Sequence, residues 1–143
     1  MAAAVARTCG VKVVGADYGV REALPLLLRQ CGGGVNLSKG AAPTPRAGWS
    51  AYCGSKAALA MFTRSIAKEY GDKRVFAYGL QPGLVDTEML VSIRRAGLNE
   101  ISRIPWQQHD TPVRSSHAIA WLADGSPSVL ADTALAYSVA CRP

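Results

Sequence analysis

Tyr52 and Lys56 are the residues whose types and spacing could do chemistry, because they stand four positions apart in AYCGSKAALA, residues 51–60. On a helix, residues at this spacing lie on one face, so the phenol and the ammonium group point the same way. A free tyrosine titrates at about pH 10, and a nearby cation favours the phenolate and lowers that pKa. A phenol tuned in this way can donate a proton to a carbonyl oxygen or accept one from an alcohol. The alternative is an ordinary helix start with a half-buried tyrosine and a solvated lysine.

A second segment with functional character follows the next expected strand, RVFAYGL, residues 74–80. Pro82 and Gly83 break this strand, and ligands in open α/β sheets bind outside the carboxyl ends of the strands. The alternative for the Pro-Gly pair is a turn at the end of a strand. Thr87 stands before an apolar helical run, so it also suits the N-cap of that helix.

The elements that must position these residues alternate between strands and helices, which predicts an α/β domain with a parallel sheet. Pro25 lies inside the first helical pattern and predicts a kink or a late helix start. Gly71 is the expected stop of the long helix, and Ser115 or Ser116 is the expected cap of the last one. We expect strands at 35–38, 74–80 and 134–140, with 11–14 as a fourth, and helices at 18–30, 50–70, from near 87, and at 115–124.

The composition is that of one globular domain, since the chain has 143 residues, of which 49% are hydrophobic and 18% charged. Its longest apolar run, at 23–28, is far shorter than the roughly 20 residues that a membrane span needs. The formal net charge of +6 comes from scattered basic residues without interleaved aromatic ones, which favours a solvated surface over nucleic-acid binding. The four cysteines form no CxxC pair, so a metal site has no support, and reduced thiols in a cytoplasmic protein are expected.

Three motifs together resemble one known family. VNLS (35–38), YCGSKAALAMF (52–62) and PGLVDTEM (82–89) occur in the order and at the spacing of the short-chain dehydrogenase/reductases. GWSAYC combined with PGLVDTEMLVSIR is similar to the sepiapterin reductase and benzil reductase branch. The resemblance covers roughly residues 18–139 and implies the catalytic half of a Rossmann-like fold, in a single truncated domain with an atypical segment at 1–17.

The resemblance also implies an activity, the reduction of a small carbonyl compound with NADP or NAD, with NADPH favoured. In family terms Tyr52 is the general acid/base, and Lys56 binds the nicotinamide ribose and lowers the pKa of the tyrosine. Family members usually associate through the helices that correspond to 18–30 and 51–70, so a homo-oligomer is expected. The segment that lines the nicotinamide corresponds to Pro82, Gly83, Val85 and Thr87.

The sequence departs from the family in its nucleotide-binding half, because no glycine-rich turn of the TGxxxGxG kind precedes the catalytic motifs. Residues 11–24, VKVVGADYGVREAL, could imitate such a turn, but Arg21 occupies the third glycine position and would obstruct a phosphate. The preferred interpretation is that residues 18–38 are the family's mid-chain helix and its fifth strand. The asparagine usual near the start of that helix falls near Ala16 or Asp17 and is absent.

The position of the family's substrate-orienting serine is occupied by Lys39. Ser38 is adjacent, but a step of one residue along a strand points to the opposite face, so its catalytic role is doubtful. These departures leave a second interpretation open, in which the chain is a catalytically impaired remnant that acts through association with another subunit. A third and weaker interpretation is a basic binding module.

Overall fold

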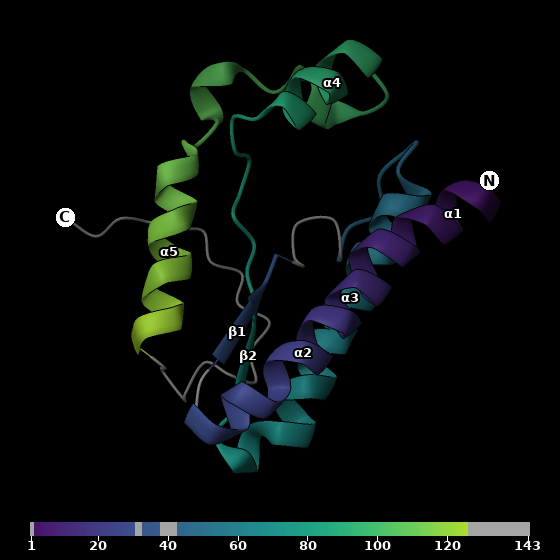
Figure 1. Ribbon diagram of the computed structural model, residues 1–143. Helices are drawn as coiled ribbons and strands as arrows, with labels where there is room; N and C mark the ends of the chain where they lie inside the picture. The colour runs from purple at the N-terminus through teal and green to yellow at the C-terminus, as the bar shows by residue number, and fades with distance from the viewer. Residues whose placement is uncertain (1, 31–32, 38–42, 126–143) are drawn as a thin grey trace.

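The computed structural model describes residues 2–30, 33–37 and 43–125 (Figure 1). The expected strand at 134–140 lies outside these residues, as do Ser38 and Lys39. The helices are α1 (Ala2–Cys9), α2 (Gly15–Gln30), α3 (Ser50–Tyr70), α4 (Glu88–Ala96) and α5 (Pro112–Gly125). The strands are β1 (Gly33–Asn36) and β2 (Phe76–Gly79), and the short turns are η1 (Gly10–Val14), η2 (Gly71–Lys73), η3 (Glu100–Arg103) and η4 (Trp106–Gln108).

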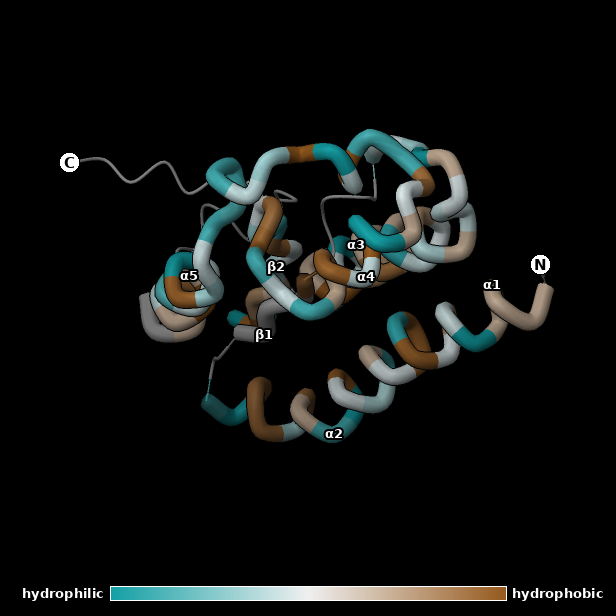
Figure 2. Tube along the Cα trace, turned by 90° about the horizontal axis from the view of Figure 1, so that it is seen from above, coloured by the Kyte–Doolittle hydropathy of each residue, from teal (hydrophilic) through white to brown (hydrophobic). Residues whose placement is uncertain are grey.

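The two described strands form the centre of a three-layer arrangement (Figures 1 and 2). β1 and β2 pair in parallel, with Gly33 opposite Phe76 and Asn36 opposite Gly79. Side chains alternate between the faces of a strand, and Tyr78 packs with Leu122 of α5 on one face. On the other face, Ala77 faces α2 and α3. The predicted class, a partial α/β Rossmann-like fold, is confirmed.

The prediction of a strand at 11–14 is wrong, because α1, η1 and α2 form one continuous helical segment over residues 2–30. In η1 the N–H of Gly15 donates to the carbonyl of Gly10, which is the wider bonding of a π-helix. Valine favours strands, but this segment packs against α3 between two helices, and that context overrides the propensity. With no strand at 11–14, the glycine-turn interpretation fails and the mid-chain interpretation stands. Pro25 lies inside α2, so the helix does not start late.

The ends of several elements differ from the sequence-based boundaries. The strand expected at 35–38 is found at Gly33–Asn36, and Leu37 follows it with 43% of its surface exposed. Gly71 has a right-handed φ of −58°, so it does not end α3 as a glycine cap would. The chain turns instead at Arg74, whose φ of 60° is left-handed. The chain turns later than predicted because α3 continues into the tighter turn η2, which includes Gly71.

The prediction of Ser115 or Ser116 as a cap is also wrong, because α5 begins three residues earlier, at Pro112. A proline at the first helical position loses no hydrogen bond and has the right φ for a helix. The hydroxyl of Ser115 donates instead to the carbonyl of Pro82, at 3.3 Å. Between α4 and α5 the chain contains the two short turns η3 and η4.

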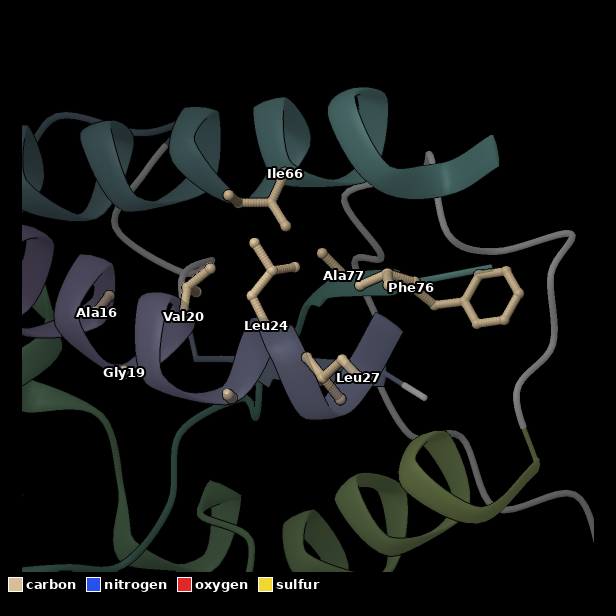
Figure 3. A pocket seen from close by; sticks show the side chains of 10 residues that line it. Ala16, Gly19, Val20, Leu24, Leu27, Ile66, Phe76 and Ala77 are labelled. Carbon is tan, nitrogen blue, oxygen red and sulfur yellow. The ribbon is translucent and has the colours of Figure 1, made fainter. Parts of the chain in front are cut away.

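Several apolar side chains of α2 line a pocket in the interior (Figure 3). Leu24 and Leu27 project toward Ile66 of α3 and Ala77 of β2, around a pocket of about 230 Å³. Ile66 is 14 residues beyond Tyr52, a distance of about 21 Å along the helix. The pocket is therefore a gap between helices and sheet, remote from the candidate pair. Within the described residues, no helix combines the length and the apolar character that crossing a bilayer requires.

Candidate active site

Tyr52 and Lys56 lie together in the first two turns of α3, as their spacing predicts. The Nζ atom of Lys56 is 5.9 Å from the centroid of the Tyr52 ring, and both side chains are half-buried. Lys56 donates a hydrogen bond to the carbonyl of Leu37, the residue directly after β1. This bond fixes the start of α3 to the carboxyl end of the sheet, where α/β proteins bind ligands.

The electrostatics of the pair differ from the expectation. Burial raises the pKa of the Tyr52 phenol, and the neighbouring Cys53 adds to the increase. Burial also lowers the pKa of Lys56, and the positive charge of Lys12 lowers it further. The net shift of the Tyr52 pKa is upward because loss of hydration disfavours both charged forms, and the prediction that Lys56 lowers the tyrosine pKa stays a prediction. What this environment holds is a neutral phenol, the form that can donate a proton.

Lys12 is the residue at this site that sequence reasoning missed. It comes from η1, and its Nζ atom is 5.4 Å from the centroid of the Tyr52 ring. Its approach depends on residues 2–30 being helical and lying beside the start of α3, as Figure 1 shows. No local pattern in the sequence signals this, since Lys12 stands in a run of valines that favours a strand.

The loop before α3 also contacts Tyr52, through the ring of Trp49. The Trp49 ring meets the Tyr52 ring edge-on, with centroids 5.4 Å apart. This loop is fixed from the far side of the chain by Asn99, whose side-chain amide donates to the carbonyl of Ala47 at 3.1 Å. Gly48 has a left-handed φ of 74°, and a Cβ there would come within 3.1 Å of the Leu98 side chain. The entry to α3 is thus defined by contacts about 50 residues away in the sequence.

The segment 82–87 leaves the carboxyl end of β2, at the same edge of the parallel sheet as Lys56. Asp110 holds it, because its N–H donates to the carbonyl of Leu84 at 2.7 Å and its own carbonyl accepts from the N–H of Asp86 at 3.0 Å. Gly83 has a left-handed φ of 79°, so the turn after Pro82 requires glycine.

Val85 forms an isolated parallel bridge with Asp110, and Thr87 occupies the N-cap of α4. The Thr87 hydroxyl donates to the carbonyl of Val85 at 3.4 Å and makes no capping bond. Among the described residues, no hydrogen bond or ion pair joins this segment to Tyr52 or Lys56.

The geometry can be compared with known proteins. The family model for the short chain dehydrogenases matches residues 1–97 of this chain. The chain belongs to the short chain dehydrogenase family. The match contains Tyr52, Lys56 and the segment 82–87, and it also includes residues 1–17.

Among curated relatives, this short chain dehydrogenase is 44% identical over 72 residues to a benzil reductase ((S)-benzoin forming) of Bacillus subtilis, a match that spans 49% of this chain and 30% of the relative. It is 47% identical over 73 residues to a benzil reductase ((S)-benzoin forming) of Saccharomyces cerevisiae, across 50% of this chain and 28% of the relative. The chain thus covers about a third of these relatives.

Among solved structures, the aldohexose dehydrogenase of Thermoplasma acidophilum is 25% identical to this chain, with a TM-score of 0.77. The superposition covers 90% of this chain and 55% of that structure. The fold described above is therefore that of about half of a full-length family member.

Ser38 and Lys39 lie outside the described residues, so the role of the substrate-orienting serine stays a prediction. In the described ranges, no three His, Cys, Asp or Glu side chains gather as a metal site would require. Cys9 and Cys53, the cysteines whose state the structure describes, are free thiols.

Proposed function

We propose that this short chain dehydrogenase reduces a small carbonyl compound to an alcohol with a nicotinamide cofactor, NADPH or NADH. The observation that carries the proposal is the half-buried Tyr52–Lys56 pair at the carboxyl edge of a parallel sheet, inside the segment matched by the family model. The bound nicotinamide supplies the hydride for the carbonyl carbon. The chain supplies the proton and the position of the substrate.

Tyr52 acts as the general acid in this proposal. Burial keeps its phenol protonated by raising its pKa, so it can donate its proton to the carbonyl oxygen as negative charge develops there. Lys56 stands on the same helical face and supplies an N–H donor for a ribose hydroxyl. It also offers a positive charge that stabilises the phenolate left after proton transfer.

The residues fit the nicotinamide end of a cofactor better than its phosphates. At the nicotinamide end, the segment Pro82, Gly83, Val85 and Thr87 offers a backbone turn held rigid by Asp110. A pyrophosphate commonly binds to the free N–H groups of a helix N-terminus. α2 offers none, because it continues from η1 without a break. We therefore propose that this chain alone binds the cofactor weakly.

The second candidate function follows from the proposed weak binding of the cofactor. In it, the chain is a catalytically impaired family member that acts by association with another subunit. Helices α2 and α3 carry apolar side chains on the surface, among them Tyr18 and Met61, which are 65% and 58% exposed. A homo-oligomer formed through these helices would cover these side chains. The free thiols suit a reducing compartment such as the cytoplasm.

The proposed function is tested by following NADPH oxidation with the purified chain and a neutral diketone. We expect Tyr52→Phe to lower any activity by about 100-fold or more, the scale of general acid catalysis. Tyr70→Phe is the matched control, since Tyr70 lies at the opposite end of α3. No turnover by the wild-type chain, together with a dimer in sedimentation at micromolar concentration, would favour the second function.

A further inference from the structure

Two lysines, from distant parts of the sequence, converge on one phenol. Lys12 of η1 and Lys56 of α3 place their Nζ atoms 5.4 Å and 5.9 Å from the centroid of the Tyr52 ring. Both lysines are half-buried. The family resemblance accounts for Lys56 alone, so Lys12 is a second cation without an assigned role.

The positive charge at this place has no ion-pair partner within the described ranges. The ion pairs found there are Arg21–Asp17, Arg46–Glu100 and Arg114–Asp110, and none includes Lys12 or Lys56. Asp17, the acidic residue nearest to Lys12 in the chain, is 2.7 Å from Arg21. The two lysines also repel each other, since Lys12 contributes to the lowered pKa of Lys56, after burial. An uncompensated pair of half-buried cations favours a bound anion.

The backbone around Lys12 is also unusual. η1 is a five-residue π-helical turn inside a long helical segment. Such turns are rare in proteins, and those that occur are often found at functional sites. The additional residue in the turn changes the direction of the side chains that follow from those of a regular helix. It is this turn that carries Lys12 to the ring of Tyr52.

We propose that Lys12 forms an anion-binding subsite beside Tyr52, and that the carbonyl substrate of this chain carries a carboxylate which binds there. The inference rests on the proposed function and names its substrate class, the oxo acids. In a small oxo acid the carboxylate lies a few bonds from the carbonyl. When the carbonyl oxygen accepts the proton of Tyr52, the carboxylate is within reach of a long, flexible ammonium side chain. Lys56, which donates to the carbonyl of Leu37, has further N–H donors for the cofactor.

The test uses the full chain labelled with ¹³C at the lysine Cε positions, observed by NMR without cofactor. Oxamate, an unreactive oxo-acid analogue, is the probe, and its neutral ester ethyl oxamate is the control ligand. We expect oxamate to shift the Lys12 signal saturably and the ester to leave it unchanged. Inorganic phosphate, added separately, represents the alternative source of an anion, a cofactor phosphate.

Variants identify the residue responsible. Lys12→Met is expected to weaken oxamate binding by about 10-fold or more, the value of a lost charge-assisted hydrogen bond. Lys73→Met is the matched control, because Lys73 lies 5.2 Å from the ring of Tyr70 but is exposed at the other end of α3. Lys12→Arg keeps the charge and is expected to retain binding. Circular dichroism verifies that each variant is folded, and the comparison of oxamate with its ester needs no variant.

Three results would overturn the inference: no saturable shift with oxamate, equal binding of the ester, or phosphate binding about 10-fold tighter than oxamate. The last would assign Lys12 to a phosphate group. Failure of the proposed function is distinguishable. If the chain reduces a neutral diketone through Tyr52 but ignores oxamate, only the substrate class is wrong. If oxamate binds at Lys12 and no carbonyl compound is reduced, only the activity is wrong.

Discussion

The two ends of α3 carry the same interaction in different surroundings. At its start, Lys12 and Lys56 lie against the ring of Tyr52, and at its end, Lys73 lies 5.2 Å from the ring of Tyr70. The lysine at the end is exposed, whereas those at the start are half-buried. A lysine beside a tyrosine therefore also occurs at the exposed end of this helix, away from the candidate site. What distinguishes the candidate site is burial, a second cation, and the carboxyl edge of a sheet.

The largest expected difference between the two ends is in catalysis. Lys56→Met removes the donor and the charge that act on Tyr52, and we expect carbonyl reduction to fall by about 100-fold. Lys73→Met should leave the rate within about twofold, because an exposed pair of this kind contributes little. Initial rates of NADPH oxidation measure both. Equal losses would mean that the comparison of the two ends carries no information about function.

A smaller difference is expected in stability, because the two ends are held differently. Gly48, before the start, has a φ of 74°, and a Cβ there would lie 3.1 Å from Leu98. Gly48→Ala should therefore lower the free energy of unfolding by about 1–3 kcal/mol. Gly71, at the other end, has a helical φ, and a Cβ added there would meet no atom within 4 Å. Gly71→Ala should raise that free energy by about 0.4–1 kcal/mol. Urea unfolding measures both changes, and a destabilising Gly71→Ala would contradict the prediction.

The smallest effect concerns the titration of Lys56. Removing the charge of Lys12 in Lys12→Met should raise the pKa of Lys56, which burial still keeps below its ordinary value of 10.5. The NMR signal of the Lys56 Cε, followed against pH, measures the change. An unchanged pKa would show that the two ammonium groups do not interact.

The same shifts set the sign of a pH effect on stability. A lysine with a lowered pKa in the folded state binds fewer protons there than in the unfolded chain. The free energy of unfolding therefore rises with pH between the folded-state pKa of Lys56 and 10.5, and Lys56→Met should remove this rise. Tyr52 acts in the opposite direction above pH 10. Because its pKa is raised in the folded state, the unfolded chain loses the phenol proton at a lower pH than the folded protein does. The free energy of unfolding therefore falls as the pH rises through this range. Denaturation at a series of pH values separates the two.

Local patterns predicted the parts of this protein that local contacts determine. The pairing of Tyr52 with Lys56 follows from helical spacing. The parallel sheet joins segments far apart in the chain, but the alternation of strands and helices along the sequence is enough to predict it. The strand at 11–14 was predicted wrongly because the strand propensity of valine contains no information about the packing of that segment against α3. Lys12 and Asp110 could not be identified from the sequence at all. Each reaches its partner only after segments far apart in the chain have come together.

The π-helical turn at Gly10–Val14 has a consequence for the order of folding. Lys12 meets Tyr52 across 40 residues of chain, and Asn99 meets Ala47 across 52, whereas Tyr52 and Lys56 are brought together within a single helix. Closing long loops costs entropy before any contact compensates for it. We therefore expect a nascent chain to possess its tyrosine–lysine pair early and to acquire its second cation late. During that interval the pair is already formed, but it still lacks the charge that would select an acidic substrate.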